Sequence, residues 1–238
     1  MSHMDPELRI DLHVHSLFSD GVLLPSELLQ RAVAKGYGAM AITDHVDSSN
    51  MEEVLTKLLR FARHGAGLYP LTFIPGVELT HVPPPLIAPL ARQARRLGAA
   101  LVLVHGETPV EPTASATNRA AVECPDVDLL AHPGFITPEE AQIAAANGVY
   151  LEITSRQGHC LTNGHVAQVA QAAGARLVVC TDTHEPGDMI DQVFARQVAA
   201  GAGLTPQGVE AATVTNLQAL VQRALRRMTS KRRPRPMG

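Results

Sequence analysis

Histidine and carboxylate side chains recur in this sequence at spacings that suit the binding of metal ions. His13 and His15 are separated by one residue, as are Asp182 and His184, and each pair follows a short apolar run. In a β-strand, residues i and i+2 point to the same side, so the two side chains of either pair can bind the same cation. Imidazole and carboxylate ligands without thiolates suit Zn²⁺, Mn²⁺ or Fe²⁺ better than copper or an iron–sulfur cluster. The spacing therefore indicates a transition-metal site.

Further candidate ligands stand at the carboxyl ends of other apolar runs. Burying so many carboxylates and imidazoles together is costly unless cations pair with them. The set is too large for one ion that keeps an open position, and it suits two or three ions. The nine candidate ligands are His13, His15, Asp20, His45, Glu78, His105, His132, Asp182 and His184.

Short apolar runs alternate with longer amphipathic stretches along most of the chain. This alternation is typical of repeated βαβ units with a parallel sheet. The expected strands are 9–14, 39–43, 72–79, 100–104, 127–131, 149–153 and 176–181, and the expected helices are 25–35, 51–65, 85–97, 115–122, 138–146, 163–173 and 188–200. A last helical pattern at about 206–226 has no strand after it, and we expect it to pack on the outside.

Seven such units can form either a closed barrel or an open doubly wound sheet. No GxGxxG or GxxxxGK[ST] motif follows any expected strand, so a nucleotide-type phosphate loop is not indicated. Almost all of the candidate ligands lie at the carboxyl ends of strands, which meet on one face of a parallel barrel, where such enzymes keep their active sites. We therefore predict an α/β fold, with a single TIM-like barrel domain over residues 5–227.

The composition narrows the class of protein. The chain has 238 residues, of which 45% are hydrophobic, so it can bury a sizeable core. No apolar run approaches the ~18 residues of a membrane span. Three cysteines without CxxC spacing argue against a disulfide framework, and no secretory pattern opens the sequence, so we expect a cytoplasmic protein.

Charge is distributed unevenly along the chain. The last 16 residues carry seven positive charges and no acid; because the formal net charge is −3, residues 1–222 carry −10. An acidic body argues against a nucleic-acid partner. The basic segment 228–238, which we predict to be a disordered tail, leaves that alternative open. The sequence does not indicate the oligomeric state.

The candidate ligands lie in an ordered set of short motifs that resembles the PHP (polymerase and histidinol phosphatase) family. The resemblance spans about residues 9–200 and implies a stand-alone PHP domain, a distorted (β/α)7 TIM-like barrel with a trinuclear metal centre. The motifs are Asp11-Leu-His13-Val-His15, Ser19-Asp20-Gly21, Thr43-Asp44-His45, Gly76-Val-Glu78, Val104-His105-Gly106, Ala131-His132-Pro133-Gly134 and Thr181-Asp182-Thr-His184.

The resemblance also implies how the ligands divide among three ions. His13, His15, Glu78 and Asp182 would hold the first ion; Glu78, His105 and His132 the second; and Asp20, His45 and His184 the third. Glu78 would bridge the first two ions. We expect Glu78, Asp182 and His184 to act in catalysis.

Known activities of the family include histidinol-phosphate phosphatase, nucleotide phosphoesterase, protein tyrosine phosphatase and polymerase-linked exonuclease. We predict a hydrolase that uses two to three divalent Zn, Mn or Fe ions and a metal-activated water to cleave a phosphate monoester of a small metabolite, either histidinol-phosphate-like or a nucleotide. One alternative is a nucleic-acid-directed phosphoesterase or exonuclease of the same family. The others are an amidohydrolase-type metal hydrolase and a non-enzymatic metal-binding module. None of the lysines, Lys35, Lys57 and Lys231, stands at a strand end, which excludes the lysine-bridged amidohydrolases.

Two arginines are candidates for binding the substrate's phosphate. Arg156 follows an expected strand on the active face, and its guanidinium fork matches phosphate geometry. Arg119 lies in the short helix after the fourth strand. The Pro- and Thr-rich loop 106–118 is a candidate lid, and His81 and His159 are candidates for contacting the substrate.

Overall fold

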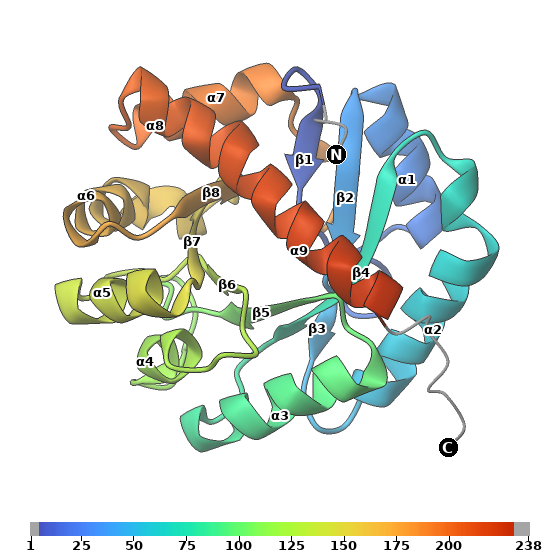
Figure 1. The fold of residues 1–238 in the computed structure, drawn as a ribbon, viewed down its shortest axis with the longest axis horizontal. Coiled ribbons are helices and arrows are strands. Elements are labelled where there is room, and N and C mark those ends of the chain that lie inside the picture. The colour runs from blue at the N-terminus through green and yellow to red at the C-terminus, as the bar shows by residue number, and fades with distance from the viewer. Residues whose placement is uncertain (1–4, 231–238) are drawn as a thin grey trace.

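A parallel β-sheet curls into a nearly closed barrel in the computed structural model, which describes residues 5–230 (Figure 1). The strands are β1 (Arg9–Asp11), β2 (Tyr37–Ile42), β3 (His45–Val46), β4 (Thr72–Leu79), β5 (Leu101–His105), β6 (Leu129–Ala131), β7 (Tyr150–Thr154) and β8 (Leu177–Cys180). Their order is β1-β2-β4-β5-β6-β7-β8, and every neighbouring pair is parallel. The predicted α/β fold, a distorted (β/α)7 TIM-like barrel, is confirmed.

Two short features complete the sheet. β3 was not expected from the sequence; it continues the line of β2 after a break and pairs with β4, where His45 lies opposite Glu78. Beyond the first and last strands, Val14 and Thr183 form a parallel bridge, and the His15 amide donates to the Thr183 carbonyl at 2.8 Å. Both features bring candidate ligands from distant parts of the sequence together at the carboxyl ends of the strands.

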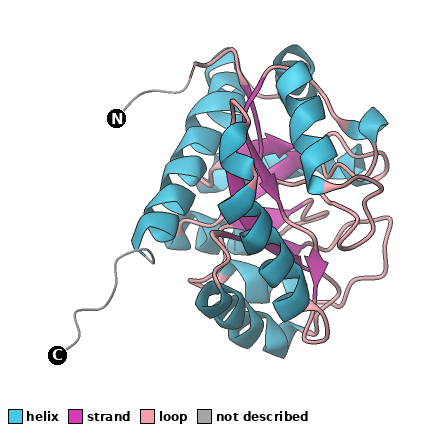
Figure 2. Ribbon diagram, turned by 90° about the vertical axis from the view of Figure 1, so that its right-hand side faces the viewer, coloured by secondary structure: helices cyan, strands magenta, loops and turns pink. Residues whose placement is uncertain are grey.

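Helices cover the outside of the barrel and one of its ends. They are α1 (Pro25–Ala34), α2 (Met51–His64), α3 (Pro84–Leu97), α4 (Thr117–Val122), α5 (Pro138–Asn147), α6 (Asn163–Ala173), α7 (Gln192–Gly201), α8 (Pro206–Glu210) and α9 (Asn216–Ser230). Figure 2 shows the strands enclosed by these helices, with the longer loops gathered on the side opposite α9.

Local sequence signals set the helix ends, and α5 shows how. The Thr137 side chain accepts a hydrogen bond from the Glu140 amide, while the Glu140 carboxylate accepts one from the Thr137 amide. Pro138 occupies the first helical turn, where its missing N–H costs nothing. Gly148 ends the helix with φ +69°, a conformation that glycine adopts without strain.

The prediction that the last helix packs on the outside is wrong. α9 lies across the N-terminal ends of the strands, and its residues Leu217, Leu220, Val221 and Ala224 are fully buried against the interior of the barrel. Figure 1 views the molecule from this end, with α9 in red across the strands. An amphipathic pattern indicates that a helix has a buried face, but not which surface covers it.

A buried carboxylate ties α9 to the barrel. Asp128, just before β6, is fully buried and pairs with Arg95 of α3 and with Arg223 and Arg227 of α9. Its carboxylate also accepts the Val102 amide at 3.2 Å. Positive charge from the chain itself thus neutralises the carboxylate at this end of the barrel.

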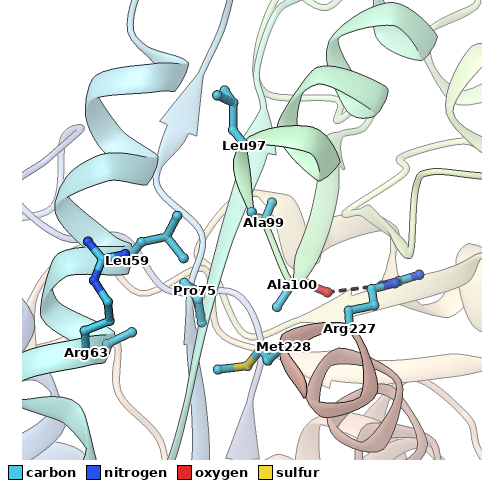
Figure 3. A pocket seen from close by; sticks show the side chains of 10 residues that line it. Leu59, Arg63, Pro75, Leu97, Ala99, Ala100, Arg227 and Met228 are labelled. Atoms are coloured by element: carbon cyan, nitrogen blue, oxygen red, sulfur yellow. Dashed lines mark hydrogen bonds between the residues drawn. The ribbon is translucent and has the colours of Figure 1, made fainter. Parts of the chain in front are cut away.

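Beside these ion pairs lies a largely apolar pocket (Figure 3). Side chains of α2, α3 and α9 line it, including Leu59, Arg63, Leu97 and Met228. The Arg227 guanidinium crosses its edge to donate to the Ala100 carbonyl at 3.1 Å. The pocket lies at the N-terminal ends of the strands, away from the candidate ligands.

Helix α9 continues to Ser230, three residues past the domain boundary predicted at 227. The rest of the predicted tail, residues 231–238, lies outside the described residues. Among residues 5–230, no helix is long and apolar enough to cross a membrane.

Candidate metal centre

The nine candidate ligands converge at the carboxyl ends of the strands, as their placement along the sequence predicted. Six of them form a buried inner group, and three lie nearer to solvent. The inner group is His13, His15, Glu78, His105, His132 and Asp182, each at most 3% exposed.

Inner-group nitrogens and oxygens face one another at short range. His13 Nε2 lies 3.3 Å from Glu78 Oε1 and 3.5 Å from Asp182 Oδ1. His15 Nε2 lies 3.0 Å from Asp182 Oδ1. His132 Nε2 lies 3.8 Å both from Glu78 Oε1 and from Asp182 Oδ2. The two carboxylates therefore stand at the centre of three imidazoles.

Several of these buried atoms have no hydrogen-bond partner in the structure. They are His13 Nε2, both ring nitrogens of His15, Glu78 Oε1, His132 Nδ1 and Asp182 Oδ1. An unsatisfied buried polar atom costs about 1 to 3 kcal/mol, and a charged one costs more. Such a concentration of unsatisfied ligand-type atoms fits a site for cations. The donor set, imidazole and carboxylate, fits Zn²⁺, Mn²⁺ or Fe²⁺.

Glu152, on β7, contacts two of the inner histidines, one through its ring and the other through its backbone amide. Its Oε1 lies 2.9 Å from His13 Nδ1, and its Oε2 accepts the His132 amide at 2.8 Å. A carboxylate bonded to one ring nitrogen fixes the tautomer and directs the other nitrogen toward the metal. Glu152 is not among the residues predicted from the sequence, because its role depends on its distances to His13 and His132.

The outer group consists of Asp20, His45 and His184. Asp20 Oδ1 lies 3.2 Å from His184 Nε2, and Asp20 Oδ2 lies 3.5 Å from His45 Nε2. His15 contributes to this group as well as to the inner one, because its ring nitrogen lies within 4.8 Å of the ligand atoms of all three. His45 Nδ1 lies 2.7 Å from Glu78 Oε2, which links the outer group to the inner group.

A buried aspartate holds the loop that carries Asp20. Asp44 accepts hydrogen bonds from the Ser16 amide at 2.7 Å, the Ser16 hydroxyl at 2.8 Å and the Ser19 hydroxyl at 2.9 Å. Burial raises the pKa of Asp44 to about 6 even though these bonds lower it. Asp44 thus positions a candidate ligand rather than serving as one.

Electrostatics within the inner group favour an ionised Glu78. Burial alone would raise the Glu78 pKa, but attraction to His13 and His45 outweighs it and holds that pKa well below its usual range. Burial likewise opposes the charged form of His13, yet the carboxylates of Glu152 and Glu78 raise its pKa well above the ordinary value. Protons on histidines therefore balance the carboxylates when no cation is bound.

The pKa values of other members of the inner group are shifted in the opposite direction: that of the carboxyl Asp182 is raised, and those of two histidines are lowered. Burial raises the pKa of Asp182 to about 7 despite attraction to His13. Burial, with repulsion from His45, holds the pKa of His15 well below its ordinary value, and burial with repulsion from His105 does the same for His132. Neutral imidazole is the form that binds a metal ion, so His15 and His132 are prepared for ligation.

An open cavity lies above the inner group, and we call it the mouth. It is lined by Asp20, His45, Thr80, His81, His105, Glu111, Arg156, His159, Asp182 and His184. Among these, Glu111 was not singled out by the sequence analysis. It comes from the Pro- and Thr-rich loop 106–118, whose lack of any periodic pattern hides which side chain turns inward.

The structure places the two candidate arginines in different surroundings. Arg156 lines the mouth, its guanidinium 2.7 Å from Asp188 Oδ2 and 3.9 Å from Asp182 Oδ2. Arg119 does not line it. Its guanidinium pairs with Glu123 and Glu139 on the outer surface, because α4 presents it along the helix side rather than toward the strand ends.

No cysteine is among the described residues that line the mouth. Burial raises the pKa of Cys180 well above its usual value, and it raises the pKa of Cys124 as well. Of the two lysines within the described residues, Lys57 pairs with Glu53 at 2.6 Å, and Lys35 follows the last turn of α1. Neither lysine lines the mouth.

This chain is similar in sequence to several known proteins. A family model described as the PHP domain matches residues 11–124. An uncharacterized protein of Methanocaldococcus jannaschii is 48% identical over 205 residues, which cover 85% of this chain and 94% of that protein. The 3',5'-nucleoside bisphosphate phosphatase of Chromobacterium violaceum is 38% identical over 71 residues, covering 30% of this chain and 22% of the phosphatase.

A solved structure extends the comparison to the whole barrel. A chain in the cryo-EM structure of archaeal ribonuclease P with mature tRNA superimposes with a TM-score of 0.61 at 16% identity, covering 94% of this chain and 91% of that one. At this level of identity the likeness concerns the fold alone.

Proposed function

Because this chain belongs to the PHP domain family, we propose that it is a metal-dependent phosphoesterase that hydrolyses a phosphate monoester of a small metabolite. One observation carries the proposal: a group of buried ligand atoms without partners lies beneath an open mouth that also holds Arg156. The partial similarity to a nucleoside bisphosphate phosphatase is consistent with this chemistry.

We assign the nine side chains to three divalent ions, Zn²⁺, Mn²⁺ or Fe²⁺. His13, His15, Glu78 and Asp182 would hold the first; Glu78, His105 and His132 the second; and Asp20, His45 and His184 the third. Glu78 is central to this division, because its Oε1 faces both His13 of the first set and His132 of the second. Its Oε2 faces His45 of the third set.

When bound, such ions lower the pKa of a water molecule and polarise phosphoryl oxygens, so no side-chain nucleophile is required. The chain's own residues set the geometry. Glu78 would share its two oxygens between ions, and Asp182 and His184 would line the reacting side of the mouth. Glu152 fixes the ring of His13. These roles account for the catalytic assignment of Glu78, Asp182 and His184.

Arg156 is the proposed phosphate clamp. Its guanidinium stands at the mouth beside Asp182 and is held from the far side by Asp188. A planar guanidinium can donate two parallel hydrogen bonds to a phosphate, which fixes its orientation. Two further acids, Asp20 and Glu111, line the mouth, and Glu185 lines an adjoining pocket that also contains Arg156. Their charge disfavours a long polyanion. A small phosphorylated metabolite fits this arrangement better.

The experiment is a phosphatase screen on metal-stripped protein, with Mn²⁺, Zn²⁺ and Fe²⁺ each added back. The panel contains amino-alcohol phosphates such as histidinol phosphate, nucleoside mono- and bisphosphates, and single-stranded oligonucleotides. We expect metal-dependent release of inorganic phosphate from one of the small monoesters. Release of nucleotides from the oligonucleotides alone would favour a nucleic-acid-directed phosphoesterase, and activity on amides or lactones alone would favour an amidohydrolase-type enzyme.

A further inference from the structure

Arginines gather at the end of the barrel opposite the mouth. They come from the second halves of α2 and α3, from the segment before β8 and from α9, which lies across this end of the barrel (Figure 1). Segments far apart in the sequence thus bring cations to one surface. We call this set the arginine band, and its members are Arg63, Arg92, Arg95, Arg176, Arg223, Arg226 and Arg227.

Arg227 joins the part of the band on α2 to the part on α3. Arg63 and Arg227 line the same pocket, and Figure 3 shows them on opposite sides of it. Arg227 and Arg95 share the carboxylate of Asp128. Arg92 lies about one helical turn before Arg95 on α3. These four arginines are therefore neighbours in space, although they belong to three helices.

Arg223 extends the band to the segment before β8. Its guanidinium also reaches Asp128, 3.4 Å from Oδ1. The guanidinium carbons of Arg223 and Arg176 lie over the ring of Tyr150, 5.4 and 5.6 Å from its centroid. Arg226 follows Arg223 by three residues, so the two are neighbours on the surface of α9. The band is thus continuous from α2 to the segment before β8.

The band is accessible and has an excess of positive charge. Its exposed members are Arg63, Arg92, Arg176 and Arg226. The structure pairs the band with two carboxylates, Asp126 and Asp128, so its arginines outnumber the acids that they contact. The formal charge of −10 over residues 1–222 therefore conceals a basic surface at one end of the barrel.

Helix geometry accounts for only part of this charge. The C-terminal ends of the outer helices meet at this end of the barrel, and a cation there offsets the partial negative charge of each helix end. α3, however, has three arginines in its last two turns, and Arg176 lies outside the helices. All members of the band are arginines, whose planar guanidinium can donate two parallel hydrogen bonds to a phosphate. The composition of the band therefore favours a partner that is rich in phosphate.

We propose that the arginine band is a docking surface for the phosphate backbone of a nucleic acid. A row of phosphodiesters matches a continuous row of guanidinium groups in charge and in shape. A membrane also presents phosphates, but proteins that bind its surface insert apolar side chains beside their cations. Among the described residues, none of the exposed large hydrophobic side chains belongs to α9 or to the last two turns of α2 and α3. The inference goes beyond the proposed function, because it concerns binding at the opposite end of the barrel and needs no catalysis.

The test measures the binding of a fluorescently labelled duplex of about 20 base pairs by anisotropy, at several salt concentrations. The whole chain is used, stripped of metal and kept in a chelator. Arg63→Gln and Arg226→Gln each remove one charge from the band and leave the ion pairs of Asp128 intact. Arg119→Gln, which removes one charge from the outer surface, is the matched control. Residues 231–238, with four further positive charges in the sequence, stay unchanged in every variant.

We expect the wild type and the control to bind the duplex with the same affinity and the same dependence on salt. Each band variant should lower the slope of log K against log salt concentration by about 0.9, because one phosphate contact fewer releases one counterion fewer. At about 50 mM salt this corresponds to binding about tenfold weaker for each variant, and the two losses should add in the double variant.

Two results would overturn the proposal. Band variants with the affinity and salt dependence of Arg119→Gln would show that any binding comes from residues outside the band. Equal or tighter binding to poly-glutamate or to phosphatidylserine vesicles, lost in the same variants, would assign the band to another class of partner. Circular dichroism checks the folding of each variant. Because the assay contains no metal, its outcome is independent of the phosphoesterase activity, which the substrate screen tests separately.

Discussion

The two ends of the barrel bury the same kind of side chain and neutralise it in different ways. At the N-terminal end, Asp128 is fully buried, and Arg95, Arg223 and Arg227 supply its counter-charge. At the C-terminal end, Glu78 and Asp182 are buried as deeply, yet each retains an oxygen that no hydrogen bond satisfies.

The contrast separates a structural use of a buried carboxylate from a functional one. A carboxylate whose counter-charge comes from arginine is paired permanently, because arginine does not lose its proton in a protein. A carboxylate surrounded by imidazoles is neutralised only while those imidazoles are protonated, and a divalent cation can take over that task. The end of the barrel that lacks a fixed counter-charge is therefore the end that can bind metal.

The largest expected effect comes from Glu78→Gln. The amide keeps the shape, but it removes the charge and turns half of the head group into a donor, which repels a cation. We expect the loss of two ions together and a fall in turnover of about 1,000-fold or more, since several kcal/mol of charge stabilisation are removed. Elemental analysis and steady-state kinetics measure both. Full metal content with near-normal turnover would refute the bridging role.

At the other end, Asp128→Asn is expected to act on stability alone. The substitution leaves three arginines around a neutral amide, and breaking a buried ion pair on one side costs about 3 to 5 kcal/mol. Urea unfolding of metal-free protein would measure this loss. Metal content and turnover of the folded fraction should match the wild type; a selective loss of metal would show that the two ends are not independent.

Arg156→Ala should have a smaller effect, confined to the mouth. Without the phosphate clamp, kcat/KM is expected to fall by about 10- to 100-fold while metal content stays constant. Arg156→Lys should recover only part of this loss, because an ammonium cannot reproduce the two-point fork. Arg119→Ala, which breaks ion pairs on the outer surface, is the control. Unchanged kinetics in both Arg156 variants would show that Arg156 does not bind the phosphate.

Changing pH should shift stability in opposite directions with and without metal. Burial opposes the charged form of His45, but Glu78 raises its pKa to about 9, and that of His13 is also raised. A raised histidine pKa stabilises the fold below about pH 6.5 and ceases to do so as pH rises through the folded value. Metal-free protein should therefore lose stability between about pH 6.5 and 9.

Metal-loaded protein should gain stability over the same interval, because ligation requires unprotonated imidazoles. The free energy of unfolding is measured by urea at about pH 6.5 and about pH 9, for protein with metal and for protein without it. Parallel trends in the two forms would contradict the view that protons substitute for cations at this end.

The sequence predicted those parts of the molecule that depend on local pattern. Apolar runs located the seven main strands, and the residues that follow them located the mouth. β3 was missed because two residues, His45 and Val46, carry no pattern of their own. The placement of α9 depends on which surface its apolar face meets, and Glu111 reaches the mouth through an irregular loop. Contacts between residues far apart in the sequence decide both.

The assignment of Arg119 shows the same limit for charged residues. Its position after a strand was compatible with the active face, but two nearby acids, Glu123 and Glu139, hold it on the outer surface. Glu152 illustrates the converse, since its role depends on distances to His13 and His132 that no spacing rule predicts.

The most direct test of the account is the number of metal ions bound per chain. Metal-stripped wild-type protein is reconstituted separately with Mn²⁺, Zn²⁺ and Fe²⁺, freed of excess ion and analysed for metal and protein together. Because the unsatisfied atoms of Glu78, Asp182 and three inner histidines require several cations, we predict at least two ions per chain. Less than about one ion per chain after reconstitution with every metal would contradict it, since clamping a phosphoryl group between ions needs two.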